Sequence, residues 1–296
     1  MRIVIAGASG LIGTELSQQL AGRGDEVIRL VRHPAERADE VEWDPARGQL
    51  DASALSGADA VVNLAGESVS RIPWTGARRA AILGSRLATT GTVVATLHEL
   101  ARRGAPLPAL VNASAVGYYG SRPGETLTEG SASGTGFLAD VARRWEAAAL
   151  AAPEGTRVVL ARTGTVIAPP GLGGAAAPLR LIARLGAAGP IGTGHQHWPW
   201  ISLHDEAAAF AHLVHSNLVG PVNLAGPTPA TAADVVRQLA ESIRRPYWLP
   251  LPAWAVTTLL GDAGRELLLG DQLERPEVLL EDGFRFRDET IADAVQ

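Results

Sequence analysis

In the first part of the chain, short continuous apolar runs alternate with stretches in which apolar residues recur at helical spacing. Short apolar runs that predict buried strands begin near residues 3, 26, 41, 59, 107 and 157. Between most of these runs, apolar residues recur at helical spacing. The clearest helices are predicted at 76–103 and 134–152. Strands that alternate with helices predict a parallel sheet covered on both faces, so the expected fold class is α/β.

The first 32 residues predict a strand, a helix and a second strand in succession. The apolar run 3–6 leads into glycines at positions 7, 10 and 13, and residues 26–32 form the next apolar run. In a βαβ unit such glycines allow a sharp turn, a close approach of backbone to a pyrophosphate, and tight helix packing. Free N–H groups at the helix start favour the phosphates. The stretch therefore predicts a dinucleotide site, with a purely structural turn as the alternative.

Arg32 bears on the choice of dinucleotide. In such folds an acidic residue at the end of the second strand binds the ribose 2′-hydroxyl of NAD, whereas an arginine accommodates the 2′-phosphate of NADP. Val31 and Arg32 occupy that place, and neither is acidic. NADP(H) is therefore the predicted cofactor. The alternative is that Arg32 is an ordinary solvated side chain at a strand end.

The pattern changes after about residue 168, where a loop rich in proline and glycine begins. The elements predicted beyond it are helices near 178–185, 205–216 and 230–243 and a strand at 222–225. The last fifty residues contain short apolar runs and prolines, which predict small helices. We therefore expect a Rossmann-type doubly wound sheet over residues 1–168, completed by returning segments of the later chain. A substrate-facing region over 169–296 would end in a small domain at 249–296.

Composition narrows the classes of partner. The formal net charge of −5 and the pI near 5.8 give no support for nucleic acid or an anionic membrane as partner. The absence of cysteine excludes disulfides and thiolate sites. The chain starts directly with the first predicted strand, and no apolar run reaches the length of a membrane span. We expect a cytoplasmic protein with a small-molecule substrate, and the composition allows a homodimer.

Histidines near residue 200 raise the question of a metal site. Residues 195–197 and 204–205 include three histidines and an aspartate, which are ligands that zinc takes. Their spacing matches no known catalytic zinc pattern, and we predict no metal. We expect this segment to form a wall of the substrate pocket, with Trp198 and Trp200 supplying flat apolar surface.

Several motifs recur in one order along the chain. They are Gly7-x-x-Gly10-x-x-Gly13, Asn63-Leu-Ala-Gly-Glu67, Gly84-Ser-Arg86, Ser114 with Tyr118-Tyr119-Gly120, Trp145-Glu146, Arg162-Thr-Gly164, Gly189-Pro-Ile-Gly192 with Trp198-Pro-Trp-Ile, and His204-x-Glu206. In this combination the chain resembles the extended short-chain dehydrogenase/reductase superfamily. Within it, the chain is most similar to the epimerase-like branch often labelled SulA-type cell-division-inhibitor homologues. The resemblance spans nearly the whole sequence.

The resemblance implies a Rossmann domain that binds NADP(H). The cofactor contacts that it implies fall on Gly7, Ser9, Gly10, Leu11, Ile12, Gly13, Arg32, Leu64, Ala65, Arg86 and Val166. Reductases and epimerases of the superfamily also use a serine, a tyrosine, and a lysine one helical turn after the tyrosine. The lysine lowers the pKa of the tyrosine, so that a phenol serves as acid or base near neutral pH.

The chain departs from this catalytic pattern, because all 26 of its Lys and Arg residues are arginine. Phe137 stands near the place of the tyrosine and Val141 at that of the lysine. The candidate catalytic residues that remain are Ser114, Tyr118 and Tyr119. Two alternatives stay open. An alignment shifted by one residue puts Ala115 at the serine position, and the hydroxyl or the rings can have purely structural roles.

These observations lead to an expected function. We expect an NADP(H)-binding, epimerase/dehydratase-like oxidoreductase of atypical type, with a small carbonyl or alcohol compound bound between the strand ends and the carboxy-terminal region. One alternative is a non-catalytic, NADP(H)-responsive regulatory protein that binds a protein partner. Another is a nucleotide-sugar epimerase, which the missing proton-handling pair makes harder to support.

Overall fold

The computed structural model describes all 296 residues and is built around one sheet of seven parallel strands. The strands, in spatial order, are β10 (Gly220–Leu224), β7 (Val158–Thr163), β5 (Ala109–Ala115), β4 (Ala60–Asn63), β1 (Arg2–Ala6), β2 (Glu26–Val31) and β3 (Glu40–Glu42). The direction of winding reverses between β1 and β4, which confirms the predicted doubly wound sheet. In such sheets ligands bind in the crevice outside the strand ends at this reversal.

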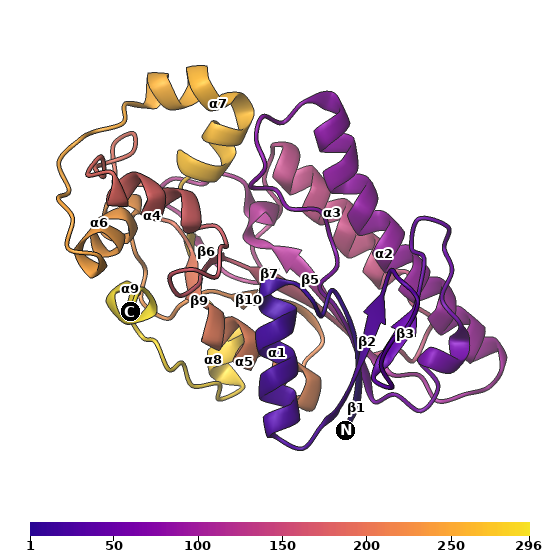
Figure 1. Ribbon diagram of the computed structural model, residues 1–296. Coiled ribbons are helices and arrows are strands. Elements are labelled where there is room, and N and C mark those ends of the chain that lie inside the picture. Colours follow the sequence, from indigo (N-terminus) through magenta and orange to yellow (C-terminus); the bar gives the residue numbers. More distant parts are fainter.

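Helices cover both faces of the sheet (Figure 1). On one face α1 (Leu11–Gly22) packs beside α5 (Leu203–His215), and on the other α2 (Gly76–Arg102) packs beside α3 (Phe137–Leu150). Successive strand residues point to opposite faces, so Ile3 and Ile5 enter one core and Val4 the other. Burial on both faces explains why the central strands have continuous apolar runs in the sequence.

The helix α2 is long and apolar enough to cross a membrane, judged by length and composition alone. In the structure it belongs to the core. Val93, Leu97 and Leu100 are buried against the sheet, and α3 lies alongside. A buried helix of a sheet-centred domain passes the same test, so the packing accounts for the apolar character of α2.

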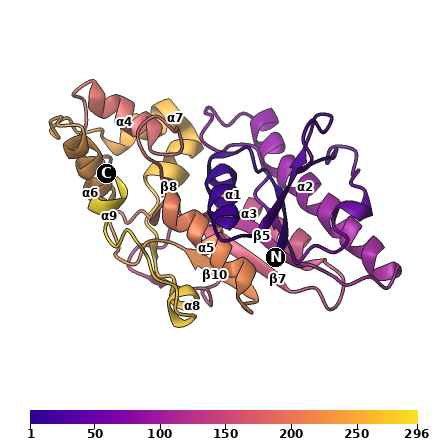
Figure 2. The same cartoon turned by 60° about the horizontal axis from the view of Figure 1, so that its bottom comes forward.

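The later part of the chain forms a smaller body beside the sheet (Figure 2). Its helices are α4 (Ala177–Arg184), α6 (Ala232–Ser242), α7 (Ala253–Leu268) and α9 (Ile291–Ala294). The short helix α8 (Glu277–Glu281) instead packs against β10 of the main sheet. Two small parallel pairs join distant segments, β6 (Thr126–Leu127) with β11 (Leu273–Glu274) and β8 (Thr165–Ile167) with β9 (Trp200–Ser202). These short strands were not predicted, because each forms only by pairing with a segment far along the chain. Two single 3₁₀ turns lie at Ala52–Ala54 and Val116–Tyr119.

The tryptophans near residue 200 lie in the core of this smaller body. Trp198 and Trp200 are buried there, and each indole N–H donates to a backbone carbonyl, of Leu268 and Thr228 respectively. The expectation that they line a substrate pocket is therefore wrong. Burial of these large rings stabilises the core once the polar N–H group has found a partner.

Candidate functional site

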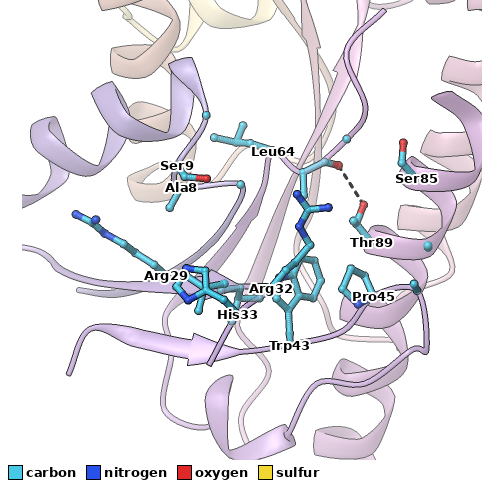
Figure 3. Close-up of a pocket in the computed structure, with 18 of the residues that line it drawn as sticks. Ala8, Ser9, Arg29, Arg32, His33, Trp43, Pro45, Leu64, Ser85 and Thr89 are labelled. Carbon is cyan, nitrogen blue, oxygen red and sulfur yellow. Dashed lines mark hydrogen bonds between the residues drawn. The ribbon is translucent and has the colours of Figure 1, made fainter. Parts of the chain in front are cut away.

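A cavity of about 830 Å³ lies at the carboxyl ends of β1, β2 and β4 (Figure 3). Predicted cofactor residues that line it are Gly7, Ser9, Gly10, Arg32, Leu64 and Ala65. Trp43 and Pro45 add flat apolar surface on the side of β3. The cavity therefore lies at the reversal of strand order, which is where a doubly wound sheet binds nucleotides.

The glycine turn forms one wall of this cavity and has no room for side chains. Gly7 has a φ of +85°, which other residues rarely adopt, and a Cβ on it would lie 3.0 Å from the backbone nitrogen of Ala65. A Cβ on Gly13 would lie 2.3 Å from the carbonyl oxygen of Gly7. Gly10 is the residue before α1, and no side chain caps the start of this helix. The backbone N–H groups of Leu11 and Ile12 therefore have no side-chain acceptor. This cradle fits a pyrophosphate.

Arg32 extends into the same cavity from the end of β2 (Figure 3). Its guanidinium has no hydrogen-bond or ion-pair partner in the structure, whereas the guanidinium of Arg29, within β2, lies 3.4 Å from the Asp39 carboxylate. His33 also lines this end of the cavity. An unpaired guanidinium beside a nucleotide cradle is a strong binding group for a phosphate.

A second cavity, of about 460 Å³, lies next to the first, with Arg86 between them. The Arg86 guanidinium donates to the carbonyl oxygen of Glu67, a residue of the first cavity, at 2.9 Å. It also lies 4.8 Å from the centre of the Trp145 ring, which lines the second cavity with Val166. Burial lowers the pKa of Arg86 to about 10, so this side chain keeps its charge at neutral pH.

Ser114 does not line either cavity. Its hydroxyl donates to Glu146 Oε1 at 2.6 Å, and the Glu146 carboxylate accepts two further hydrogen bonds from Arg162, each at 2.9 Å. All three side chains are buried. Ala115, the residue of the alternative alignment, does line the second cavity but carries no reactive group. The Ser114 hydroxyl is thus committed to a buried ion pair, and its catalytic role stays a prediction.

The two candidate tyrosines also lie outside both cavities. The buried Tyr119 hydroxyl donates to Asn223 at 2.6 Å and accepts from Arg162 at 2.9 Å. Burial raises the pKa of Tyr119 above its ordinary value. The Tyr118 ring stacks on the Arg162 guanidinium, 3.6 Å from its central carbon. Both rings therefore contact Arg162, and their catalytic role stays a prediction.

The side of α3 that borders the second cavity is apolar. Leu138, Val141, Ala142 and Trp145 line it, and Val141 is the residue at the expected lysine position. Phe137 packs edge-on against Trp74 instead, with ring centres 5.2 Å apart. No ionisable side chain of α3 reaches the cavity, so an acid or base must come from another element.

Sequence reasoning missed several polar residues of the second cavity. Thr163, Thr165, Arg265, Glu266 and Gln272 all line it. The last three come from the carboxy-terminal body, and no sequence signal relates them to the strands. Glu266 accepts hydrogen bonds from the backbone N–H groups of Phe137 and Leu138, at 2.9 and 2.8 Å. It therefore fastens α7 to the start of α3.

The contact made by Glu266 leads to a stability prediction. Glu266→Gln should destabilise the chain by about 1 to 2 kcal/mol, because a carboxylate at a helix start binds N–H groups more strongly than an amide. Urea unfolding of this variant and of the exposed control Glu241→Gln measures the difference. Equal losses in the two variants would contradict the role assigned to Glu266.

The histidine and aspartate side chains near residue 200 go to separate partners. His197 Nδ1 lies 2.9 Å from Asp271, and the Asp205 carboxylate accepts from the backbone N–H groups of Arg287 and Asp288. No group of three or more potential metal ligands comes together in the structure.

Comparison with known proteins identifies the family. Residues 3–225 match the model of the NAD dependent epimerase/dehydratase family. The chain belongs to this family. Residues 251–296 match a second model, a domain of unknown function called DUF1731. The resemblance drawn from the sequence motifs is therefore confirmed.

Individual family members are similar over nearly the whole of this chain. Epimerase family protein Mb2239 of Mycobacterium bovis is 39% identical, over 99% of this chain and 96% of its own length. The crystal structure of human epimerase family protein SDR39U1 with NADPH superposes with a TM-score of 0.87 at 33% identity, covering 99% of this chain and 97% of that chain. A nucleoside-diphosphate sugar epimerase from Corynebacterium glutamicum has a TM-score of 0.79 at 32% identity, covering 99% of this chain and 57% of that chain.

Proposed function

We propose that the chain binds NADP(H) across the two cavities and acts as an atypical oxidoreductase on a small carbonyl or alcohol compound. The observation that carries the proposal is the unpaired Arg32 guanidinium in a cavity opened by the glycine turn. The human relative with 33% identity was crystallised with NADPH, which supports the choice of cofactor. A cytoplasmic location and a homodimer stay predictions.

Each part of the dinucleotide has a matching set of groups. The start of α1 would hold the pyrophosphate, Arg32 the 2′-phosphate, and Trp43 the adenine. Arg86 and Val166 would border the nicotinamide half, in the second cavity. When bound, NADPH supplies reducing equivalents to a carbonyl carbon, and the protein supplies binding and orientation. The apolar side of α3 excludes water from that place.

Titration calorimetry tests the cofactor proposal directly. We expect heat of binding with NADPH and NADP⁺, and an affinity for NADH lower by about tenfold or more because the 2′-phosphate loses a charge-assisted contact. If only the sheet and the glycine turn bound the cofactor, NADPH and NADH would bind with equal affinity. If neither NADPH nor NADH gives heat of binding, the proposed function is overturned. If NADH binds more tightly than NADPH, only the role assigned to Arg32 is overturned.

A second candidate function is an NADP(H)-responsive regulator without catalysis. The apolar side of α3 favours it, because the usual acid and base are absent there. Incubation with NADPH and a metabolite extract, followed by absorbance of the reduced cofactor, separates the two. Consumption of NADPH supports the oxidoreductase, whereas cofactor-dependent capture of a protein partner without consumption supports the regulator. The same apolar surface counts against a nucleotide-sugar epimerase.

A further inference from the structure

The second cavity contains one hydroxyl that leads to a buried acid. Thr163 lines the cavity at the end of β7, and its hydroxyl donates to Glu206 Oε1 at 2.8 Å. Glu206 lies on α5 behind the cavity wall and has no exposed surface. Its second oxygen, Oε2, has no hydrogen-bond partner in the structure. A buried carboxyl with only one neutral partner is disfavoured in its charged form.

The strand register places Thr163 beside Ala115 at the cavity. Thr163 is the parallel partner of Ala115, and Arg162 is the partner of Ser114. Paired residues of neighbouring strands point to the same face, and successive residues alternate. Ser114 and Arg162 therefore meet at Glu146 on one face, whereas Ala115 and Thr163 border the cavity. At this place β7 therefore contributes the hydroxyl residue Thr163 to the cavity lining, whereas its partner on β5, Ala115, has no hydroxyl.

The other charged groups of the cavity are poor proton donors. Arg86 and Arg265 are guanidinium groups, which do not give up a proton in a protein. Glu266 accepts two backbone N–H hydrogen bonds, and these favour its charged form. Of the ionisable groups that line or directly contact the cavity wall, Glu206 is the one whose surroundings favour a bound proton.

We propose that Thr163 is the hydroxyl that contacts the reacting oxygen of a ligand in the second cavity, and that Glu206 gives and recovers the proton through it. This inference rests on the proposed function. If NADPH is the reductant, it would give a hydride to the carbonyl carbon and become NADP⁺, while the carbonyl oxygen takes the hydroxyl proton of Thr163. Thr163 in turn takes the carboxyl proton of Glu206, which becomes a carboxylate. Oxidation of an alcohol moves the proton back along the same path, so protons balance in both directions.

The electrostatic surroundings support this assignment. Burial raises the pKa of Glu206 to about 8, and the hydrogen bond from Thr163 opposes that rise. The charged group near Glu206 on β11 is Glu274, whose pKa is raised by burial and by the charges of Glu129 and Glu206, while Arg162 opposes the rise. On α5 itself, Asp205 is turned toward two backbone N–H groups near the carboxy terminus. These surroundings favour the protonated form of Glu206.

Infrared spectroscopy of the full chain against pH tests the pair without a substrate. The carbonyl band of protonated carboxyl groups is recorded for the wild type, Glu206→Gln, and the control Glu274→Gln, which removes a different buried acid. The component lost in Glu206→Gln should titrate near pH 8. Thr163→Val should raise that midpoint by about 1 to 2 pH units, because the carboxylate loses its hydrogen-bond donor. Thr163→Ser, which keeps the hydroxyl, should leave it within about 0.5 unit.

NADPH then tests whether the pair communicates with the cavity. The cofactor displaces water and adds negative charge, so it should raise the Glu206 midpoint by about 0.5 to 1 pH unit in the wild type and in Glu274→Gln. The proposal is overturned if Thr163→Val has the same Glu206 midpoint as the wild type. It is also overturned if the wild-type midpoint is the same with and without NADPH although calorimetry shows that NADPH is bound. If calorimetry shows no binding, the proposed function fails, and the role of Thr163 toward a ligand fails with it. The Thr163→Val shift would then report only a structural hydrogen bond.

Discussion

Arg162→Met is expected to destabilise the protein by about 3 to 5 kcal/mol, because it leaves the Glu146 carboxylate buried without its counter-charge. Arg162 donates two hydrogen bonds to Glu146 and one to Tyr119, and it stacks on Tyr118. Burial would lower the pKa of Arg162, but these contacts raise it above its ordinary value. The same guanidinium thus joins α3, β7 and the turn after β5.

Urea unfolding followed by circular dichroism measures this loss. A matched control is Arg143→Met on α3, where Arg143 is solvent-exposed and pairs with Asp140 at 3.1 Å. An exposed pair of this kind contributes about 0 to 1 kcal/mol. Adding Glu146→Gln to Arg162→Met should recover part of the loss, since the unpaired charge is removed. Similar losses in the two arginine variants would refute the assignment of Arg162 as the centre of the buried network.

Arg32→Glu is expected to weaken NADPH binding by about 100-fold while NADH binding changes by less than about threefold. The substitution replaces an attractive charge beside the expected 2′-phosphate with a repulsive one. NADH has a hydroxyl there, which interacts weakly with either side chain. The variant should therefore reverse the preference between the two cofactors.

Calorimetric titration with both cofactors at one salt concentration measures this change. The control is Arg37→Glu, which has the same charge change on an exposed arginine that does not line the cavity. If Arg37→Glu lowers the NADPH affinity as much as Arg32→Glu does, the loss results from the change in net charge and not from a lost contact with the 2′-phosphate. The preference for NADPH would then have to come from another group.

The carboxy-terminal half shows where prediction from sequence had limits. The helices α4, α5 and α6 were predicted close to their observed bounds, because each repeats apolar residues at helical spacing. The last fifty residues were expected to form only small helices, yet α7 spans Ala253–Leu268, with a kink at Gly261. Trp198 and Trp200 were expected in a pocket wall, and their place in a second core depends on contacts with segments far along the chain.

The sequence by itself determined the parts of this protein that depend on neighbours along the chain. The apolar periods determined the parallel sheet, the glycine spacing determined the turn before α1, and Arg32 follows its strand directly. The tertiary structure decided which side chains meet. Ser114 and Ala115 differ by one position, and only the register of β5 on β7 decides which of them faces the cavity. Likewise Thr163 and Glu206 meet only because α5 packs beneath the sheet, since hydrogen-bond partners distant in sequence are chosen by packing.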